Sequence, residues 1–173
     1  MSDMIGIGRR QSAMDGRPDK RTLAEMLLPR DILLEVKAPG KFELLEQIGQ
    51  HMEWVHGVSR DLVLRSLLHR EHIGSTAMGQ GVAIPHARID NMDQIRIAYL
   101  HLGAAIDFDA PDGKPVEDVF VILVPKAASE VHLRILGEAS QMFSDAQFRE
   151  QLHRCTHPAD VKLLFDTRGR SLR

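Results

Sequence analysis

The sequence has few of the residues that mark several specialised protein classes. It holds one cysteine, Cys155, among 173 residues, which excludes an internal disulfide framework and a zinc site built on two thiols. Its longest apolar runs, such as residues 119–124, are far shorter than a bilayer crossing, and no charged and then apolar leader opens the chain. We therefore expect no direct membrane insertion and a cytoplasmic location, where thiols stay reduced.

Neither charge nor aromatic content favours nucleic acid as a partner. Lys and Arg number 22 against 24 Asp and Glu, for a formal net charge of -2, so no chain-wide basic field exists. Aromatic residues make up 5% of the chain and are too scattered for a base-stacking platform. We expect no nucleic acid binding.

The composition is that of a globular protein with one main domain. Hydrophobic residues account for 43% and charged residues for 27%, close to the averages for globular chains. Residues 1–21 combine glycines and basic residues without apolar periodicity, which predicts a flexible N-terminal extension. We predict a single domain over residues 22–168 and a C-terminal tail over residues 169–173.

The first part of this domain shows helical periodicity around a short strand. Thr22 and Glu25 have capping-box spacing, which predicts a short helix, and a brief apolar strand is expected over residues 32–36. Apolar residues recur at helical spacing over residues 41–54 and again after Ser59, a good N-cap. We predict two consecutive amphipathic helices, the first closed by Gly57.

Strands and helices then alternate along the rest of the chain. Residues 82–84, 95–102 and 119–124 are expected as strands, for about four strands in all. Helices are predicted over residues 128–143 and 145–155, followed by a short one that starts at Pro158. Such interleaving predicts an α/β fold, with a mixed β-sheet sandwiched by helices.

Nine histidines are present, and most lie in polar contexts. We predict solvated imidazoles for His51, His56, His69, His72 and His101. The run from His153 through Cys155 to His157 suggests a metal site. However, Pro158 starts a new helix there and no fourth ligand has suitable spacing, so we predict no metal site.

His86 stands apart because it directly follows a buried strand and Pro85, where α/β sheets present ligand-binding groups. The nearby Ser75, Thr76 and several glycines could approach an anion, but their spacing matches neither common phosphate-loop pattern. From these residues alone, two interpretations of His86 stay open: a reactive histidine, or a structural one at a strand end.

His132 falls on the apolar face of the helix predicted over residues 128–143. It is interpreted either as a buried neutral imidazole bonded to a backbone carbonyl or as part of a phosphate site. In the second case it would act with His86 and Arg70, because a guanidinium offers fork-shaped donors to phosphoryl oxygens.

Two segments carry a resemblance to a known family. Residues 70–76 (REHIGST) and 79–86 (GQGVAIPH) closely resemble the active-site signature of the fructose- and mannitol-type enzyme IIA domains of the bacterial phosphotransferase system. The chain looks most like the nitrogen-related enzyme IIA proteins within that family. The resemblance spans residues 22–167, with residues 108–113 and 123–125 as supporting motifs. It implies the enzyme IIA fold of the mannitol and fructose type.

The resemblance also assigns roles to residues. It implies that His86 becomes a tele-phosphohistidine, accepting a phosphoryl group on Nε2 from a histidine-containing phosphocarrier protein, with His132 and Arg70 flanking the phosphate. We expect Ser75 and Thr76 to add hydrogen bonds to it, and no metal or other cofactor to be needed. One departure stands out: Ala87 occupies a position that is commonly glycine in the family.

By resemblance, the expected function is a phosphoryl relay in the nitrogen-related phosphotransferase system that regulates partners such as sensor kinases or potassium transport proteins. An alternative is an enzyme IIA component that passes phosphate to a fructose- or mannitol-type sugar permease. Two further classes stay open, a binding regulator without transfer and a metal-assisted hydrolase using His86 and His132. Retention of the phosphate-site residues argues against the first, and the lack of a neighbouring carboxylate ligand argues against the second.

Overall fold

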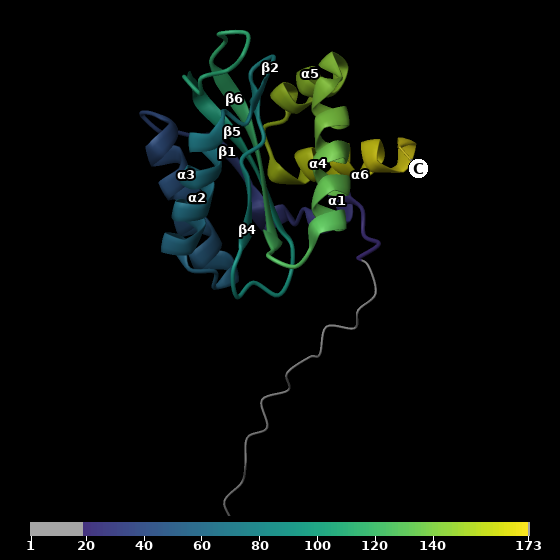
Figure 1. The fold of residues 1–173 in the computed structure, drawn as a ribbon. Coiled ribbons are helices and arrows are strands. Elements are labelled where there is room, and N and C mark those ends of the chain that lie inside the picture. Colours follow the sequence, from purple (N-terminus) through teal and green to yellow (C-terminus); the bar gives the residue numbers. More distant parts are fainter. Residues whose placement is uncertain (1–18, 173) are drawn as a thin grey trace, which may run out of the picture.

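The computed structural model describes residues 19–172, so the predicted N-terminal extension lies outside the described residues except for residues 19–21 (Figure 1). These three residues contact the domain, because the Arg134 guanidinium donates hydrogen bonds of 2.8 Å to the carbonyls of Asp19 and Arg21. At the other end, the last helix continues to Ser171. Residues 169–171, predicted as part of a C-terminal tail, continue this helix.

A six-stranded mixed sheet forms the centre of the structure, with strand order β1-β5-β6-β3-β2 and with β4 also paired to β6. Strand β5 is antiparallel to β6, whereas β1 runs parallel to β5, and both β3 and β4 run parallel to β6. The strands are β1 Ile32–Val36, β2 Ala77–Gly79, β3 Val82–Ala83, β4 His86–Ile89, β5 Arg96–Ile106 and β6 Val116–Pro125.

The predicted mixed sheet is confirmed, but the expected number of strands is too low. The missing strands β2 and β4 have three and four residues, too few to show an alternating pattern in sequence. Pro85 divides the predicted strand over residues 82–84 from β4, and its carbonyl accepts a hydrogen bond from the Ile122 amide. The chain thus stays beside β6 across the break and delivers His86 at the start of β4.

Helices cover both faces of the sheet, as predicted (Figure 1). One face carries α2 and α3, and the other carries α1, α4, α5 and α6. The helices are α1 Leu23–Met26, α2 Lys41–His56, α3 Arg60–Ile73, α4 Ser129–Ser144, α5 Ala146–Arg154 and α6 Pro158–Ser171, and a 3-10 turn, η1 Pro29–Asp31, precedes β1.

The apolar run in β6 explains the two-sided core. Because successive side chains of a strand point to opposite faces, Phe120, Ile122 and Val124 pack with α4, α5 and α6. Their neighbours at 119, 121 and 123 pack with α2 and α3. A strand buried on both faces is continuously apolar, as this run is.

Helix ends follow the sequence signals. Thr22 and Glu25 form the predicted capping box, and the Ser59 hydroxyl accepts from the Leu62 amide. Gly57 ends α2 in the left-handed conformation, with φ of 68°. The helix at Pro158 is longer than predicted, 14 residues, because Val161 and Phe165 bury one face in the core.

Within residues 19–172, no helix combines the length and apolarity that a bilayer crossing requires.

Two glycines provide a test of how tightly α2 packs on α3. A Cβ added at Gly49 would lie 2.9 Å from the Arg60 carbonyl oxygen, whereas one at Gly137 on α4 would meet nothing within 4 Å. Gly49→Ala is expected to lower the free energy of unfolding by about 1–3 kcal/mol through overpacking. Gly137→Ala is expected to raise it by about 0.5–1 kcal/mol, because alanine favours helix. Urea unfolding measures both; equal effects would contradict the tight packing at Gly49.

Candidate functional site

The orientation of His86 is set by its own neighbouring backbone. Its Nδ1 lies 2.7 Å from the carbonyl oxygen of Ile84. A carbonyl oxygen accepts hydrogen bonds and cannot donate them, so Nδ1 carries the proton and Nε2 keeps the lone pair. Pro85, between the two residues, restricts the backbone that makes this contact. The geometry therefore leaves Nε2 as the ring nitrogen with a free lone pair.

His132 reaches His86 from α4, and the two ring centroids are 5.3 Å apart at an interplanar angle of 71°. The His132 residue is 8% exposed. Its Nδ1 is buried without a hydrogen-bond partner among the described residues. A buried polar atom left unpaired costs about 1–3 kcal/mol, so a ligand that bonded to this nitrogen would stabilise the site.

A cavity of about 570 Å³ opens over these two histidines. Its walls come from α3, from the start of β4 and from His132. Three arginines, Arg65, Arg70 and Arg88, line it, and none of the described lining residues is acidic. This distribution of charge suits an anion with several oxygens, such as a phosphoryl group.

Both histidines are held neutral. Burial lowers the pKa of His86 below its ordinary value, and the charge of Arg70 lowers it further, against the opposing effects of the Ile84 carbonyl and Glu71. Burial also lowers the pKa of His132, as do the nearby His86, Arg88 and Arg70. At neutral pH, His86 therefore keeps a free lone pair for attack on an electrophile.

Arg70 lies in the last turn of α3, where its Nη1 donates a 2.8 Å hydrogen bond to the Gly74 carbonyl. This bond satisfies a carbonyl just beyond the helix and fixes the guanidinium at the cavity. A guanidinium has five N–H donors, so others are left to bind a ligand.

Glu71 supports the loop behind the site. One carboxylate oxygen accepts from the Thr76 amide at 3.0 Å and from the Thr76 hydroxyl, and the other lies 3.1 Å from Nζ of Lys41. Lys41 also pairs with Asp109 at 2.9 Å. Burial opposes the charge of Lys41, but its bonds to Asp109 and Glu71 prevail and raise its pKa. The network joins the start of α2 to the end of α3.

Comparison with known proteins agrees with this geometry. Residues 25–167 match the family model described as "Phosphoenolpyruvate-dependent sugar phosphotransferase system, EIIA 2". The chain belongs to this EIIA 2 family.

Several relatives carry nitrogen-regulatory names. A nitrogen regulatory protein of Pseudomonas aeruginosa is 39% identical over 137 residues, which cover 75% of this chain and 85% of the relative. The crystal structure of nitrogen regulatory protein IIA-Ntr from Neisseria meningitidis is 36% identical, with a TM-score of 0.79 over 83% of this chain and 98% of that one. A fructose-specific EIIA component of Haloferax volcanii is 42% identical over 93 residues, 54% of this chain and 60% of the relative.

The mannitol-type enzymes share the fold. The crystal structure of IIA mannitol from Escherichia coli has a TM-score of 0.66 at 19% identity, over 79% of this chain and 96% of that one. The fold type expected from the sequence is therefore confirmed.

In this EIIA 2 domain, two predicted phosphate ligands have other partners. The Ser75 hydroxyl donates a 2.6 Å hydrogen bond to the Phe108 carbonyl and accepts one from the Ala77 amide. Thr76 is bound to Glu71, and neither residue lines the cavity. The structure thus brings together His86, His132 and Arg70 but not Ser75 and Thr76, which instead hold the loop between α3 and β2 in place.

Arg88 is a cavity residue that the sequence analysis missed. In β4, residues 86 and 88 project to the same face of the strand, so Arg88 joins His86 at the cavity. A strand predicted directly after Pro85 would have placed residues 86 and 88 on one face and so indicated Arg88. Alanine is tolerated at residue 87, the position that is commonly glycine in the family. Ala87 pairs with Leu123 in the sheet and does not have a positive φ.

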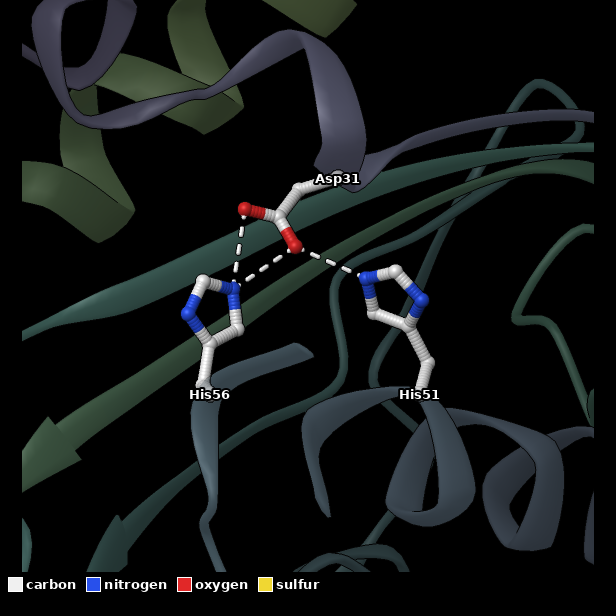
Figure 2. A group of neighbouring side chains, drawn as sticks. All are labelled: Asp31, His51 and His56. Atoms are coloured by element: carbon white, nitrogen blue, oxygen red, sulfur yellow. Dashed lines mark hydrogen bonds and ion pairs between the residues drawn. The ribbon is translucent and has the colours of Figure 1, made fainter. Parts of the chain in front are cut away.

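Three histidines predicted to be solvated are bound to buried carboxylates, and for them that prediction is wrong. His51 and His56 bond to Asp31, and His101 bonds to Asp118 (Figure 2). His153, part of the run considered above as a metal site, also bonds to Asp118. Local sequence gives no sign of these partners, because the carboxylates lie 17 to 35 residues away along the chain.

The neutral state of His86 is testable by NMR titration of its ring nitrogens. We expect a midpoint below 6.5, because burial and Arg70 both oppose the charged imidazolium. Arg70→Gln removes the repelling charge, so the midpoint should rise while staying below 6.5. Because the native pKa is the lower one, this histidine's contribution to stability is lost as pH falls below about 6.5. A wild-type midpoint at or above 6.5 would contradict the assignment.

Proposed function

We propose that this EIIA 2 protein relays a phosphoryl group through His86, accepting it from a histidine-containing phosphocarrier protein and regulating partners by its phosphorylation state. The observation that supports this most strongly is the Nδ1 contact with the Ile84 carbonyl, which leaves Nε2 free beside a basic cavity. The nitrogen-regulatory names of its relatives support the regulatory part of the proposal.

The transfer exchanges similar bonds. The Nε2 lone pair of neutral His86 attacks the phosphorus of the donor's phosphohistidine, a new N–P bond forms, and the donor's N–P bond breaks with its electron pair returning to the donor imidazole. The proton on Nδ1 stays in its bond to the Ile84 carbonyl. The reaction is therefore reversible and depends on positioning more than on acid or base chemistry.

The residues around His86 supply charge stabilisation. Arg70 and Arg88 line the cavity with N–H donors for the equatorial phosphoryl oxygens, and His132 adds an imidazole donor. Because these groups are in place before the donor arrives, they stabilise the charge of the transition state without reorganisation.

Phosphorylation changes the docking surface of the cavity. It adds a charge of about -1.5 to -2 to a basic cavity whose wall includes Ile73, which is 71% exposed. Partners that bind the unmodified surface then differ from those that bind the phosphorylated one. We propose that these partners are regulatory, such as sensor kinases or potassium transport proteins.

A second candidate is transfer from His86 to a fructose- or mannitol-type sugar permease. It is supported by the identity to the fructose-specific EIIA component of Haloferax volcanii. A phosphorylated sample mixed with a permease's phosphate-accepting domain separates the two candidates, since a regulator retains its phosphate.

Intact-mass measurement tests the relay. After incubation with phosphoenolpyruvate, the system's enzyme I and its phosphocarrier, the wild type should gain one acid-labile phosphoryl group. His86→Ala should gain none, because it lacks the accepting nitrogen. A wild type that stays unmodified while a known enzyme IIA is phosphorylated in the same mixture would reject the relay.

His132→Ala tests the neighbouring imidazole. The variant keeps His86 and its backbone contact, so it should still accept one phosphoryl group, but about 100-fold more slowly because a donor to the transition state is lost. Quenched-flow phosphorylation measures the rate, and His72→Ala, at an exposed position outside the cavity lining, is the control. An unchanged rate in His132→Ala would remove this residue from the machinery.

A further inference from the structure

A second group of histidines lies outside the cavity over His86 and His132. Asp31 ends η1 immediately before β1, and His51 and His56 come from the last turns of α2. Asp31 is buried and the two histidines are partly buried, with side-chain exposed fractions of 2% for Asp31, 13% for His51 and 1% for His56. None of them takes part in the proposed phosphoryl chemistry.

The ligand-type atoms of these side chains converge (Figure 2). Nε2 of His51 lies 2.7 Å from Oδ1 of Asp31, and Nε2 of His56 lies 2.8 Å from Oδ1 and 3.0 Å from Oδ2. The other nitrogen of each ring is on the side turned away from the carboxylate (Figure 2). Two imidazole nitrogens and one carboxylate thus converge on one point.

We propose that Asp31, His51 and His56 form a binding site for one zinc ion. Two imidazole nitrogens and one carboxylate make up the three-ligand set found in open zinc sites, with a fourth position for water. Imidazole ligands favour zinc and its transition-metal neighbours over magnesium and calcium, which prefer oxygen.

The side chains need small adjustments to hold the ion. Zinc bonds of about 2.0–2.1 Å place tetrahedral ligands about 3.3 Å apart, so the present contacts must widen by a few tenths of an ångström. Each imidazole also moves its proton from Nε2 to the outward-facing Nδ1, which frees the Nε2 lone pair.

Access to the site comes through His51. This residue lines a cavity of about 700 Å³ between α2 and β1, together with Gln47, Gln50 and Trp54. Trp54 is 91% exposed and is the one tryptophan of the sequence. Water in this cavity supplies the fourth ligand, and the indole provides a local fluorescent probe.

A similar trio elsewhere is less suited to a metal. Asp118, His101 and His153 also bring three ligand atoms within 4.8 Å of one another. However, Oδ1 of Asp118 already accepts a 2.7 Å hydrogen bond from the buried Tyr99 hydroxyl. Binding a metal through this oxygen would cost that bond, whereas the Asp31 carboxylate bonds to the two metal-ligating imidazoles themselves.

The proposed zinc site is independent of the relay. Helices α2 and α3 run antiparallel, with Glu53 bonded to the Arg60 amide at one end and Lys41 paired with Glu71 at the other. The zinc ligands lie toward the first end and Arg70 toward the second, roughly 15 Å from Arg60 along α3. A bound ion would link η1 to the end of α2 and stabilise the fold without entering phosphoryl transfer.

Zinc titration of the untagged full-length chain, first freed of metal with a chelator, tests the site. Calorimetry should show one equivalent bound with a Kd at or below about 10 µM. His51→Gln keeps an N–H donor for Asp31 but replaces the imidazole, so zinc affinity should fall at least about tenfold. His72→Gln and His153→Gln serve as matched controls and should bind like the wild type.

Two further readouts locate the ion. Zinc at about one hundred times its Kd should raise the wild-type Tm by about 5–10 °C and raise that of His51→Gln by at most about half as much. Cobalt, used as a zinc substitute, should quench Trp54 fluorescence at lower concentration in the wild type than in the variant. Weaker binding than about 10 µM, or loss of the zinc in His153→Gln with retention in His51→Gln, would overturn the proposal. Phosphoryl acceptance by His51→Gln should match the wild type in either case.

Discussion

The hydrogen bond from His86 Nδ1 to the Ile84 carbonyl is the contact on which the site depends. It selects one tautomer and leaves Nε2 as the nitrogen with a lone pair. It also ties the His86 ring to the backbone on the other side of Pro85. There the chain passes from β3 to β4 while staying beside β6. An imidazole whose orientation is fixed before a donor arrives loses little entropy on reaction, which is what positioning contributes to phosphoryl transfer.

The surrounding charges complement this orientation. Arg70 and Arg88 make the cavity attractive to a phosphoryl group and, together with burial, keep the nearby imidazoles uncharged. In the proposed relay, the same charges would bind the incoming phosphoryl group and keep the His86 lone pair free. Glu71 has a structural role. It bonds to Thr76 and Lys41 and so fixes the end of α3 against the loop before β2 and the start of α2.

Local sequence patterns predicted the helices, their caps and the two-faced core, because these depend on periodicity within a few residues. They also supported the grouping of His86 with His132 and Arg70, through motif resemblance. They did not indicate the partners of the Ser75 and Thr76 hydroxyls, which are the Phe108 carbonyl and Glu71. They failed for His51 and His56, because their partner Asp31 is brought to them by the tertiary fold.

NMR of the phosphorylated protein, labelled with ¹⁵N in its histidines, tests whether the Ile84 contact selects the reacting nitrogen. We expect coupling to phosphorus at Nε2 of His86, while Nδ1 keeps its proton and its bond to the Ile84 carbonyl. Phosphorus bonded to Nδ1 of His86, or to any other histidine, would contradict the claim that this backbone contact selects the reacting nitrogen.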